Sequence, residues 1–114
     1  MVSLQRDGGT VQVRPTPWER LAGLLPPLDV PVTAVVSLEV VQDPLPAARG
    51  FRMGLHLPGV TKIGRYARSG ELSYVSVRRG EPAVRVHLTG QHFRTLLVST
   101  PDADRIVDRL LQPA

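Results

Sequence analysis

Residues 72–89, with the sequence LSYVSVRRGEPAVRVHLT, contain the pattern that decides the fold. In the second half, Val84, Val86 and Leu88 alternate with polar residues, which is typical of a half-buried strand. In the first half, Val75 and Val77 share one face, while Leu72 lies off it. The four residues between the halves, Arg-Gly-Glu-Pro at 79–82, are turn formers. The stretch therefore predicts a β-hairpin with strands Leu72–Arg78 and Ala83–Thr89.

The flanking segments continue the same pattern. Ser69-Gly70 is a turn signal, and the residues before it, Thr61–Ala67, predict another strand. After the hairpin, Phe93–Ser99 predicts one more strand. Short strands that follow one another through turns predict an antiparallel meander over residues 61–99.

Two helix starts lie outside the meander. In Thr16-Pro17-Trp18-Glu19, threonine is an N-cap, proline takes the first helical position and glutamate completes a capping box. Thr100-Pro101-Asp102 repeats the threonine cap and adds an acid where the helix dipole favours it. We expect two apolar stripes to pack against the core: Trp18, Leu21, Ala22 and Leu25 in the first helix, and Ile106, Val107, Leu110 and Leu111 in the second.

The remaining segments complete the expected fold. Val2–Arg14 predicts a hairpin around Asp7-Gly8-Gly9. Val30–Gln42 contains the longest apolar run and predicts one long, bent strand, while residues 44–59 are expected to form an extended loop. The expected fold is mainly β (α+β): a seven-stranded bent barrel or sandwich with a C-terminal helix and a short helix inserted after the second strand.

Length and composition limit the class of protein. A chain of 114 residues predicts one domain, residues 1–114, since domains commonly run to about 100–150 residues. The sequence has no cysteine, which excludes disulfides, thiolate nucleophiles and cysteine-based zinc sites. The first residues lack the apolar run of a secretory signal peptide, and no window approaches the roughly 18 apolar residues of a membrane span. We expect a cytoplasmic protein, either free or peripheral at the membrane.

Charge is concentrated in the second half of the chain. The net charge is +4, but residues 49–94 hold nine basic side chains against Glu71 and Glu81, so this segment is +7 and the rest is −3. Thirteen of the fourteen basic residues are arginine, which suits planar anions such as carboxylate and phosphate. An arginine preference of a GC-rich genome is the alternative explanation.

The order of the expected elements resembles the pleckstrin homology (PH) fold. Three stretches are similar to a group of small bacterial PH-like domains: RGFRMGLHLPGVTKIGRY (49–66), LSYVSVRRGEPAVRVHL (72–88) and FRTLLVSTPDADRIVDRLL (93–111). The resemblance covers residues 30–112 best and implies a binding or assembly module, often in membrane-associated proteins, and not an enzyme. Lipid-binding PH domains hold inositol phosphates with basic residues between their first two strands. In this sequence that loop is Asp7-Gly8-Gly9, short and acidic, which argues against such a ligand.

Gly54–Thr61 has the G-x-x-x-x-G…T spacing of a phosphate-binding loop. The lysine that should precede the threonine is replaced by Val60, Pro58 removes a backbone N–H, and a strand is expected to follow instead of a helix. We therefore expect no nucleotide and no other cofactor. Gly50, Gly54, Gly59 and Gly64 instead indicate turns and a β-bulge where the chain bends into the barrel.

Histidine and serine give little sign of a reactive centre. His87 and His92 are five residues apart with no acid between them, and His56 lies far from both in the sequence, whereas zinc sites need three or four convergent ligands. Ser73, Ser76 and Ser99 lie in expected strands without a nucleophile-elbow motif. We therefore expect neither a metal site nor catalytic residues, although an unrecognised spatial constellation would leave a small enzyme as an alternative.

A basic face is the best candidate for binding. Arg78, Arg85 and His87 alternate with core residues, so they are expected to point outward on neighbouring strands, and Tyr66 and Tyr74 are the aromatic candidates for stacking on bases. The expected partner is an acidic protein or another copy of the chain, bound at this face or at an exposed sheet edge. An anionic membrane surface is the alternative, with nucleic acid less favoured, and a merely solvated face is the simplest interpretation. The candidate residues are Arg65, Arg68, Arg78, Arg79, Arg85, His87 and Arg94.

Overall fold

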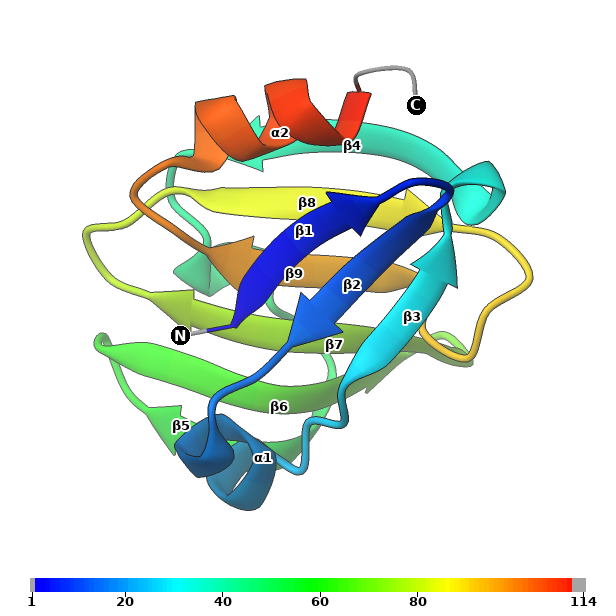
Figure 1. Cartoon of the computed structure of the whole chain (residues 1–114). Helices are drawn as coiled ribbons and strands as arrows, with labels where there is room; N and C mark the ends of the chain where they lie inside the picture. Colours follow the sequence, from blue (N-terminus) through cyan, green and yellow to red (C-terminus); the bar gives the residue numbers. More distant parts are fainter. Residues whose placement is uncertain (1, 112–114) are drawn as a thin grey trace.

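The computed structural model describes residues 2–111, which form nine strands, two α-helices and two 3-10 helices (Figure 1). The strands are β1 (Ser3–Asp7), β2 (Thr10–Arg14), β3 (Leu28–Pro31), β4 (Val35–Val41), β5 (Phe51–Leu57), β6 (Thr61–Arg68), β7 (Glu71–Arg78), β8 (Ala83–Leu88) and β9 (Thr95–Ser99). The helices are α1 (Pro17–Gly23), η1 (Val32–Ala34), η2 (Leu45–Ala47) and α2 (Ala103–Leu111).

The strands form two sheets, one in front of the other in Figure 1. The smaller has the order β1-β2-β3 and the larger β4-β8-β9-β7-β6-β5. The main core lies between them, where Val13 and Val30 of the small sheet pack in one cluster with Val86 and Leu96 of the large sheet. The mainly β class is confirmed, as is the first hairpin, because β1 and β2 pair around the Gly8-Gly9 turn.

The expectation of a single strand over Val30–Gln42 is wrong. The segment divides at η1 into β3, which pairs with β2, and β4, which pairs with β8. Pro31 ends β3, because proline has no N–H to extend a ladder. The backbone N–H of Val32 then bonds the carbonyl of Gly9 at 2.8 Å, and that of Thr89 bonds the carbonyl of Ala34 at 2.9 Å. The chain therefore crosses from one sheet to the other within a single turn.

The expectation of a loop over residues 44–59 is also wrong, because residues 51–57 form strand β5. Phe51, Met53, Leu55 and Leu57 alternate with other residues, which is the strand signal that the surrounding glycines and prolines obscured. β5 pairs with β6 in an unbroken antiparallel register from Phe51 to Leu57. These two strands, with the correctly expected turn at Gly59 between them, form the end of the large sheet.

Gly54 and Gly64 lie opposite each other in this ladder, and not in a turn or bulge as expected. Both have positive φ, +145° and +157°, a backbone conformation that residues with a side chain rarely adopt. A Cβ on Gly54 would lie 2.3 Å from the carbonyl oxygen of Ile63. The two glycines therefore allow β5 and β6 to approach closely.

The expected meander over residues 61–99 is only partly correct. β6 and β7 are antiparallel neighbours, but β9 inserts between β7 and β8 and runs parallel to β7. The loop from β8 carries the chain back, where the N–H of Arg94 bonds the carbonyl of Leu72 at 2.8 Å. As a result, β7 and β8 share a turn but are not neighbours in the sheet.

The closing helix is confirmed as α2, which lies at the top of Figure 1 and packs against β1, β4 and β8. Ile106 and Val107 join the main core and Leu110 is buried, whereas Leu111 is exposed, contrary to the expected stripe. On the outer face of the large sheet, a second cluster forms beneath η2 around Tyr66, Val75 and Leu97. Within residues 2–111, neither helix is long and apolar enough to cross a membrane.

Candidate interaction surface

Helix α1 turns its apolar residues away from the core, in contrast to the expected stripe. Trp18 is 59% exposed and Leu21 is 76% exposed, while the helix buries Glu19 and Gly23. A Cβ on Gly23 would lie 2.5 Å from a side-chain carbon of Ile63, so the helix is pressed closely onto β6 at this point. Leu25, expected in the stripe, lies beyond the helix and is buried in the main core.

Glu19 explains this orientation. The expected capping box is present: its Oε1 accepts the backbone N–H of Thr16 at 3.2 Å, and its own N–H donates to the Thr16 hydroxyl at 3.3 Å. The second carboxylate oxygen accepts a hydrogen bond from the hydroxyl of Ser76 on β7. Burial acts to raise the pKa of Glu19, but the hydrogen bonds that its carboxylate accepts, from Ser76 and Thr16 among others, outweigh it and lower the pKa. This anchor fixes which side of α1 faces solvent.

Strand β5 lies beside α1 and at the end of the large sheet, so within residues 2–111 one of its edges has no strand neighbour. Its apolar side chains are on the face that α1 covers only in part, and Phe51 remains 72% exposed. Together α1 and β5 present a surface, named here the α1–β5 surface. It consists of Trp18, Leu21, Leu24, Phe51, Met53, Leu57 and Val60.

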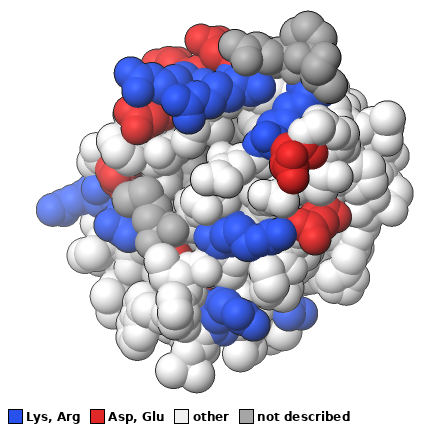
Figure 2. Space-filling model, in the orientation of Figure 1, with Lys and Arg blue, Asp and Glu red and all other residues white. Residues whose placement is uncertain are grey.

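A cleft of about 440 Å³ lies within this surface, between α1 and the turn from β5 to β6. Trp18, Leu57 and Val60 contribute apolar side chains to its lining, and Arg78 and Arg79 contribute basic ones. Figure 2 shows the area over α1, at the lower left, as largely uncharged with basic side chains at its border. The surface is thus apolar in its centre and polar at its margin, as protein interfaces are.

The seven basic residues expected to form one face are spread over three places. Arg85 and His87 lie on the outer face of the large sheet. There the carboxylate of Glu39 on β4 accepts a hydrogen bond from Arg85 at 2.7 Å and lies 3.2 Å from the ring of His87. These hydrogen bonds, that of Arg85 above all, lower the pKa of Glu39. Arg68 lines the same face without an ion pair among the described residues, beside a cleft of about 410 Å³.

The remaining basic residues are paired or lie away from this group, although Arg94 lines a second cleft together with His87. Arg94 contacts Glu71 at 3.3 Å, and Arg78 lies 3.9 Å from Glu81. Arg65 is on the opposite face, where its guanidinium lies over the ring of Phe93 and its Nε donates to the carbonyl of Leu24 at 3.0 Å. Because β9 separates β7 from β8, Arg78 is not a neighbour of Arg85 and His87, contrary to expectation.

The aromatic candidates for base stacking are both buried. Tyr74 is fully inside the main core, where its hydroxyl donates to the carbonyl of Pro26 at 2.8 Å, and burial, reinforced by Glu19, raises its pKa. Tyr66 lies in the second cluster, and burial raises its pKa despite the opposing charge of Arg52. Neither ring is available to stack on a nucleic-acid base.

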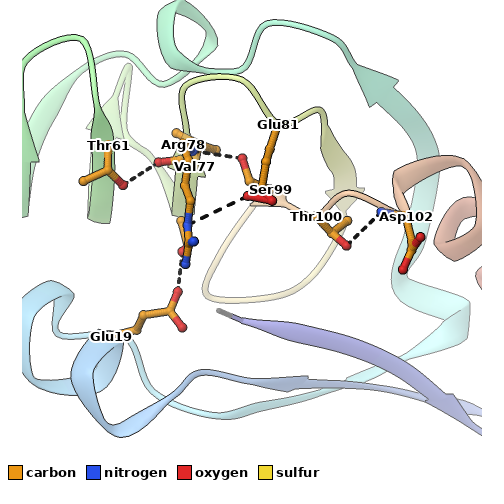
Figure 3. Close-up of polar contacts among 9 residues, drawn as sticks. Glu19, Thr61, Val77, Arg78, Glu81, Ser99, Thr100 and Asp102 are labelled. Atoms are coloured by element: carbon orange, nitrogen blue, oxygen red, sulfur yellow. Dashed lines mark hydrogen bonds and ion pairs between the residues drawn. The ribbon is translucent and has the colours of Figure 1, made fainter.

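The residues considered for chemistry are dispersed. Ser76 bonds Glu19 and Ser99 accepts the backbone N–H of Arg78 at 3.0 Å, so both hydroxyls serve the fold (Figure 3). Across the part of the chain that the structure describes, no three histidine or acidic side chains gather as a metal site would require.

The α1–β5 surface did not emerge from the sequence. A signal for it exists in the alternation of residues 51–57, but the sequence could not say that this apolar side would stay exposed. Comparison with known proteins adds no further assignment: no family model, curated protein or solved structure matches the chain.

Proposed function

We propose that this chain is a non-enzymatic binding or assembly module that docks another polypeptide through the α1–β5 surface. One observation carries the proposal: seven of the nine large hydrophobic side chains exposed within residues 2–111 belong to this surface. A contiguous apolar patch rimmed by polar groups marks an interaction site, because its burial is favourable by about 25 cal/mol per Å².

The free edge of β5 supports the same proposal. An unpaired edge presents backbone N–H and C=O groups that a strand from another chain can pair with. Pairing would supply direction and register, and the neighbouring apolar side chains would supply most of the free energy of association.

A PH-like architecture remains part of the proposal. Two sheets packed face to face and a closing C-terminal helix support it. The nine strands and the parallel pairing of β7 with β9 depart from the seven-stranded arrangement that the resemblance implies.

Binding through the basic residues receives less support. Arg78, Arg85 and Arg94 each have a glutamate partner, which neutralises much of the charge available to an anionic membrane or to nucleic acid. Binding to an anionic membrane and binding to nucleic acid are therefore treated as alternative outcomes of the crosslinking test below.

The test uses a photo-reactive amino acid, p-benzoylphenylalanine, in place of Leu21 in the cells that make this protein. The matched control carries the same group at Val36, an exposed apolar position on β4, outside the surface. We expect discrete covalent adducts with polypeptide from position 21 and much weaker ones from position 36. The adducts are identified by mass spectrometry.

Two results would overturn the proposal. One is the absence of polypeptide adducts at position 21, or equal adduct formation at both positions. The other is an adduct population at position 21 that consists of lipid or nucleic acid.

A further inference from the structure

We infer that the polypeptide docked at this surface is a second copy of the same chain, paired antiparallel through β5 about a two-fold axis at Gly54. The inference rests on the proposed function and names the partner. It follows from the backbone of β5, the pattern of its side chains, the position of α1 and the state of the other sheet edges.

The backbone of β5 identifies the groups available for pairing. The N–H of Val60 bonds the carbonyl of Leu57 at 3.0 Å, which directs the polar groups of Leu57 toward the turn and β6. Because hydrogen-bonding direction alternates along an antiparallel strand, the N–H and C=O of Arg52, Gly54 and His56 face the free edge. The close approach of Gly54 to Gly64 agrees, since non-hydrogen-bonded pairs are the narrow ones.

An axis at Gly54 pairs the whole strand with its own copy. Gly54 then bonds Gly54 of the second copy, and Arg52 lies opposite the second copy's His56. Within one chain the Arg52 guanidinium already lies 2.6 Å from Nδ1 of His56, which must be the acceptor because arginine only donates. Across the axis, the Arg52 guanidinium of one copy meets His56 of the other and can donate to it in the same way, so the two arginines do not face each other.

The side chains of the other face are self-complementary in this register. Met53 lies opposite Leu55 of the second copy, and Phe51 opposite its Leu57. Every cross-strand pair on this face is therefore apolar, the kind of pair that stabilises antiparallel strands.

Helix α1 extends the contact beyond the strand. The start of α1 lies near Leu57, because Trp18 and Leu57 line the same cleft. The end of α1 lies near Met53, because Arg65 bonds the carbonyl of Leu24 and pairs with Met53 in the β5–β6 ladder. Two-fold symmetry therefore brings the Trp18 end of one copy to the Phe51 end of the other. The two helices cover the paired β5 strands from one side.

The area is adequate for a stable dimer. The seven side chains of the α1–β5 surface are each 39% to 76% exposed. They present on the order of 700 Å², close to the roughly 800 Å² per partner of a standard stable interface.

The other sheet edges are protected, which leaves β5 as the edge for self-pairing. β4 carries a bulge between Val35 and Ser37 and is packed by α2, which also packs against β1. β3 has four residues and ends in Pro31. Bulges, proline, short length and covering helices are the usual ways in which proteins block edge pairing. β5 pairs with β6 without a bulge and contains no proline, and α1, the helix that packs against it, lies over β6 as well.

The first experiment compares Arg52→Pro with Arg52→Ala by light scattering on purified protein at increasing concentration. Proline removes the N–H that faces the free edge and leaves the β5–β6 ladder intact, whereas alanine removes the charge but keeps the N–H. The wild type should reach twice the chain mass of 12.5 kDa. Arg52→Ala loses the exposed guanidinium contact with His56 but keeps the ladder bonds, so it should still dimerise, with a smaller rise in dissociation constant than Arg52→Pro. Arg52→Pro should raise the dimer dissociation constant roughly tenfold or more, since symmetry removes two ladder bonds at once.

The second experiment tests the register and does not depend on the proline variant folding. The chain has no cysteine, so Met53→Cys and Leu55→Cys proteins can be mixed and oxidised without background. We expect the mixed 53–55 disulfide to form faster than 53–53 or 55–55, because only that pair lies directly opposite in the proposed register. Val36→Cys is the control and should remain uncrosslinked.

The outcomes separate the inference from the proposed function. A wild type that stays monomeric at high concentration overturns the self-pairing, while the adducts at position 21 still decide the wider proposal. A dimer that Arg52→Pro leaves intact, or a disulfide pattern without the 53–55 preference, overturns pairing through β5. A dimer with both expected responses supports the inference.

Discussion

Glu19 is the one fully buried charged side chain within residues 2–111, and it links helix α1 to the large sheet. Its carboxylate satisfies the N-terminus of α1 and the hydroxyl of Ser76 together. A buried charge is tolerated only when hydrogen bonds replace the water it has lost. Here those bonds also decide which face of the helix is exposed, so one residue determines the position of the interaction surface.

Replacing Glu19 with glutamine should make the protein less stable and less sensitive to acid. The folded-state pKa of Glu19 lies below its ordinary value of 4.5, so its contribution is complete above pH 4.5 and is lost as pH falls through the folded value. At pH 7 we expect a loss of about 1–3 kcal/mol in the free energy of unfolding. Urea denaturation at pH 7 and at successively lower pH measures the free energy of unfolding of both proteins. The difference between the wild type and Glu19→Gln should become smaller below pH 4.5.

The control for this prediction is Glu39→Gln, which removes an exposed ion pair with Arg85. Exposed pairs contribute at most about 1 kcal/mol, so this variant should stay close to the wild type. An equal acid dependence for Glu19→Gln and the wild type would contradict the role given to Glu19.

Gly54 is the second residue on which the surface depends. Alanine at this position would meet the carbonyl oxygen of Ile63 and keep an unfavourable positive φ. We expect Gly54→Ala to lower the free energy of unfolding by about 1–3 kcal/mol or more. Gly9→Ala, with nothing within 4 Å of the added carbon, should have little effect. Thermal and urea unfolding of both variants check this, and equal stability would show that the β5–β6 approach is not tight.

At the scale of elements, β5 combines a paired edge and a free edge in one strand. Phe51, Met53 and Leu55 direct their backbone groups to β6, whereas Arg52, Gly54 and His56 direct theirs outward. A partner strand should therefore change the hydrogen exchange of the outward-facing amides and leave that of the amides bonded to β6 unchanged.

Amide hydrogen exchange measures this difference. In Leu21→Glu, which should remain folded because Leu21 is exposed and should be monomeric, the amides of Gly54 and His56 are expected to exchange much faster than those of Met53 and Leu55. In the concentrated wild type, all four should be protected. Equal protection of both sets in Leu21→Glu would contradict the proposed direction of the β5 backbone.

At the scale of the whole molecule, charge and apolar surface lie in different places. The basic side chains of the second half of the chain are distributed over both faces of the large sheet and several are paired with glutamate. Most of the exposed large apolar side chains within residues 2–111 belong instead to α1, β5 and the residues that follow them. Association should therefore depend on apolar burial more than on charge.

Salt dependence tests this separation. Between low and high ionic strength we expect the dimer dissociation constant to change by less than about threefold, because apolar contacts are not screened. Sedimentation equilibrium at two salt concentrations gives the constant. A steep weakening with salt would instead indicate that the arginines drive association.

The sequence by itself determined the features that depend on neighbouring residues. The capping box of α1, the Gly8-Gly9 hairpin, the alternation of the strands from residue 61 onward and the closing helix were all predictable from it. Each of these follows from interactions that span a few residues.

Only the tertiary structure decided how these elements combine. The insertion of β9 between β7 and β8, the change of sheet at η1 and the position of β5 at a free edge depend on contacts between distant segments. An alternating pattern such as that of β5 indicates that one side of a strand is apolar, but what covers that side is set elsewhere in the chain. Here the cover is α1, held by Glu19 against Ser76 with Trp18 and Leu21 facing outward, and a bond across 57 positions of sequence leaves no local trace.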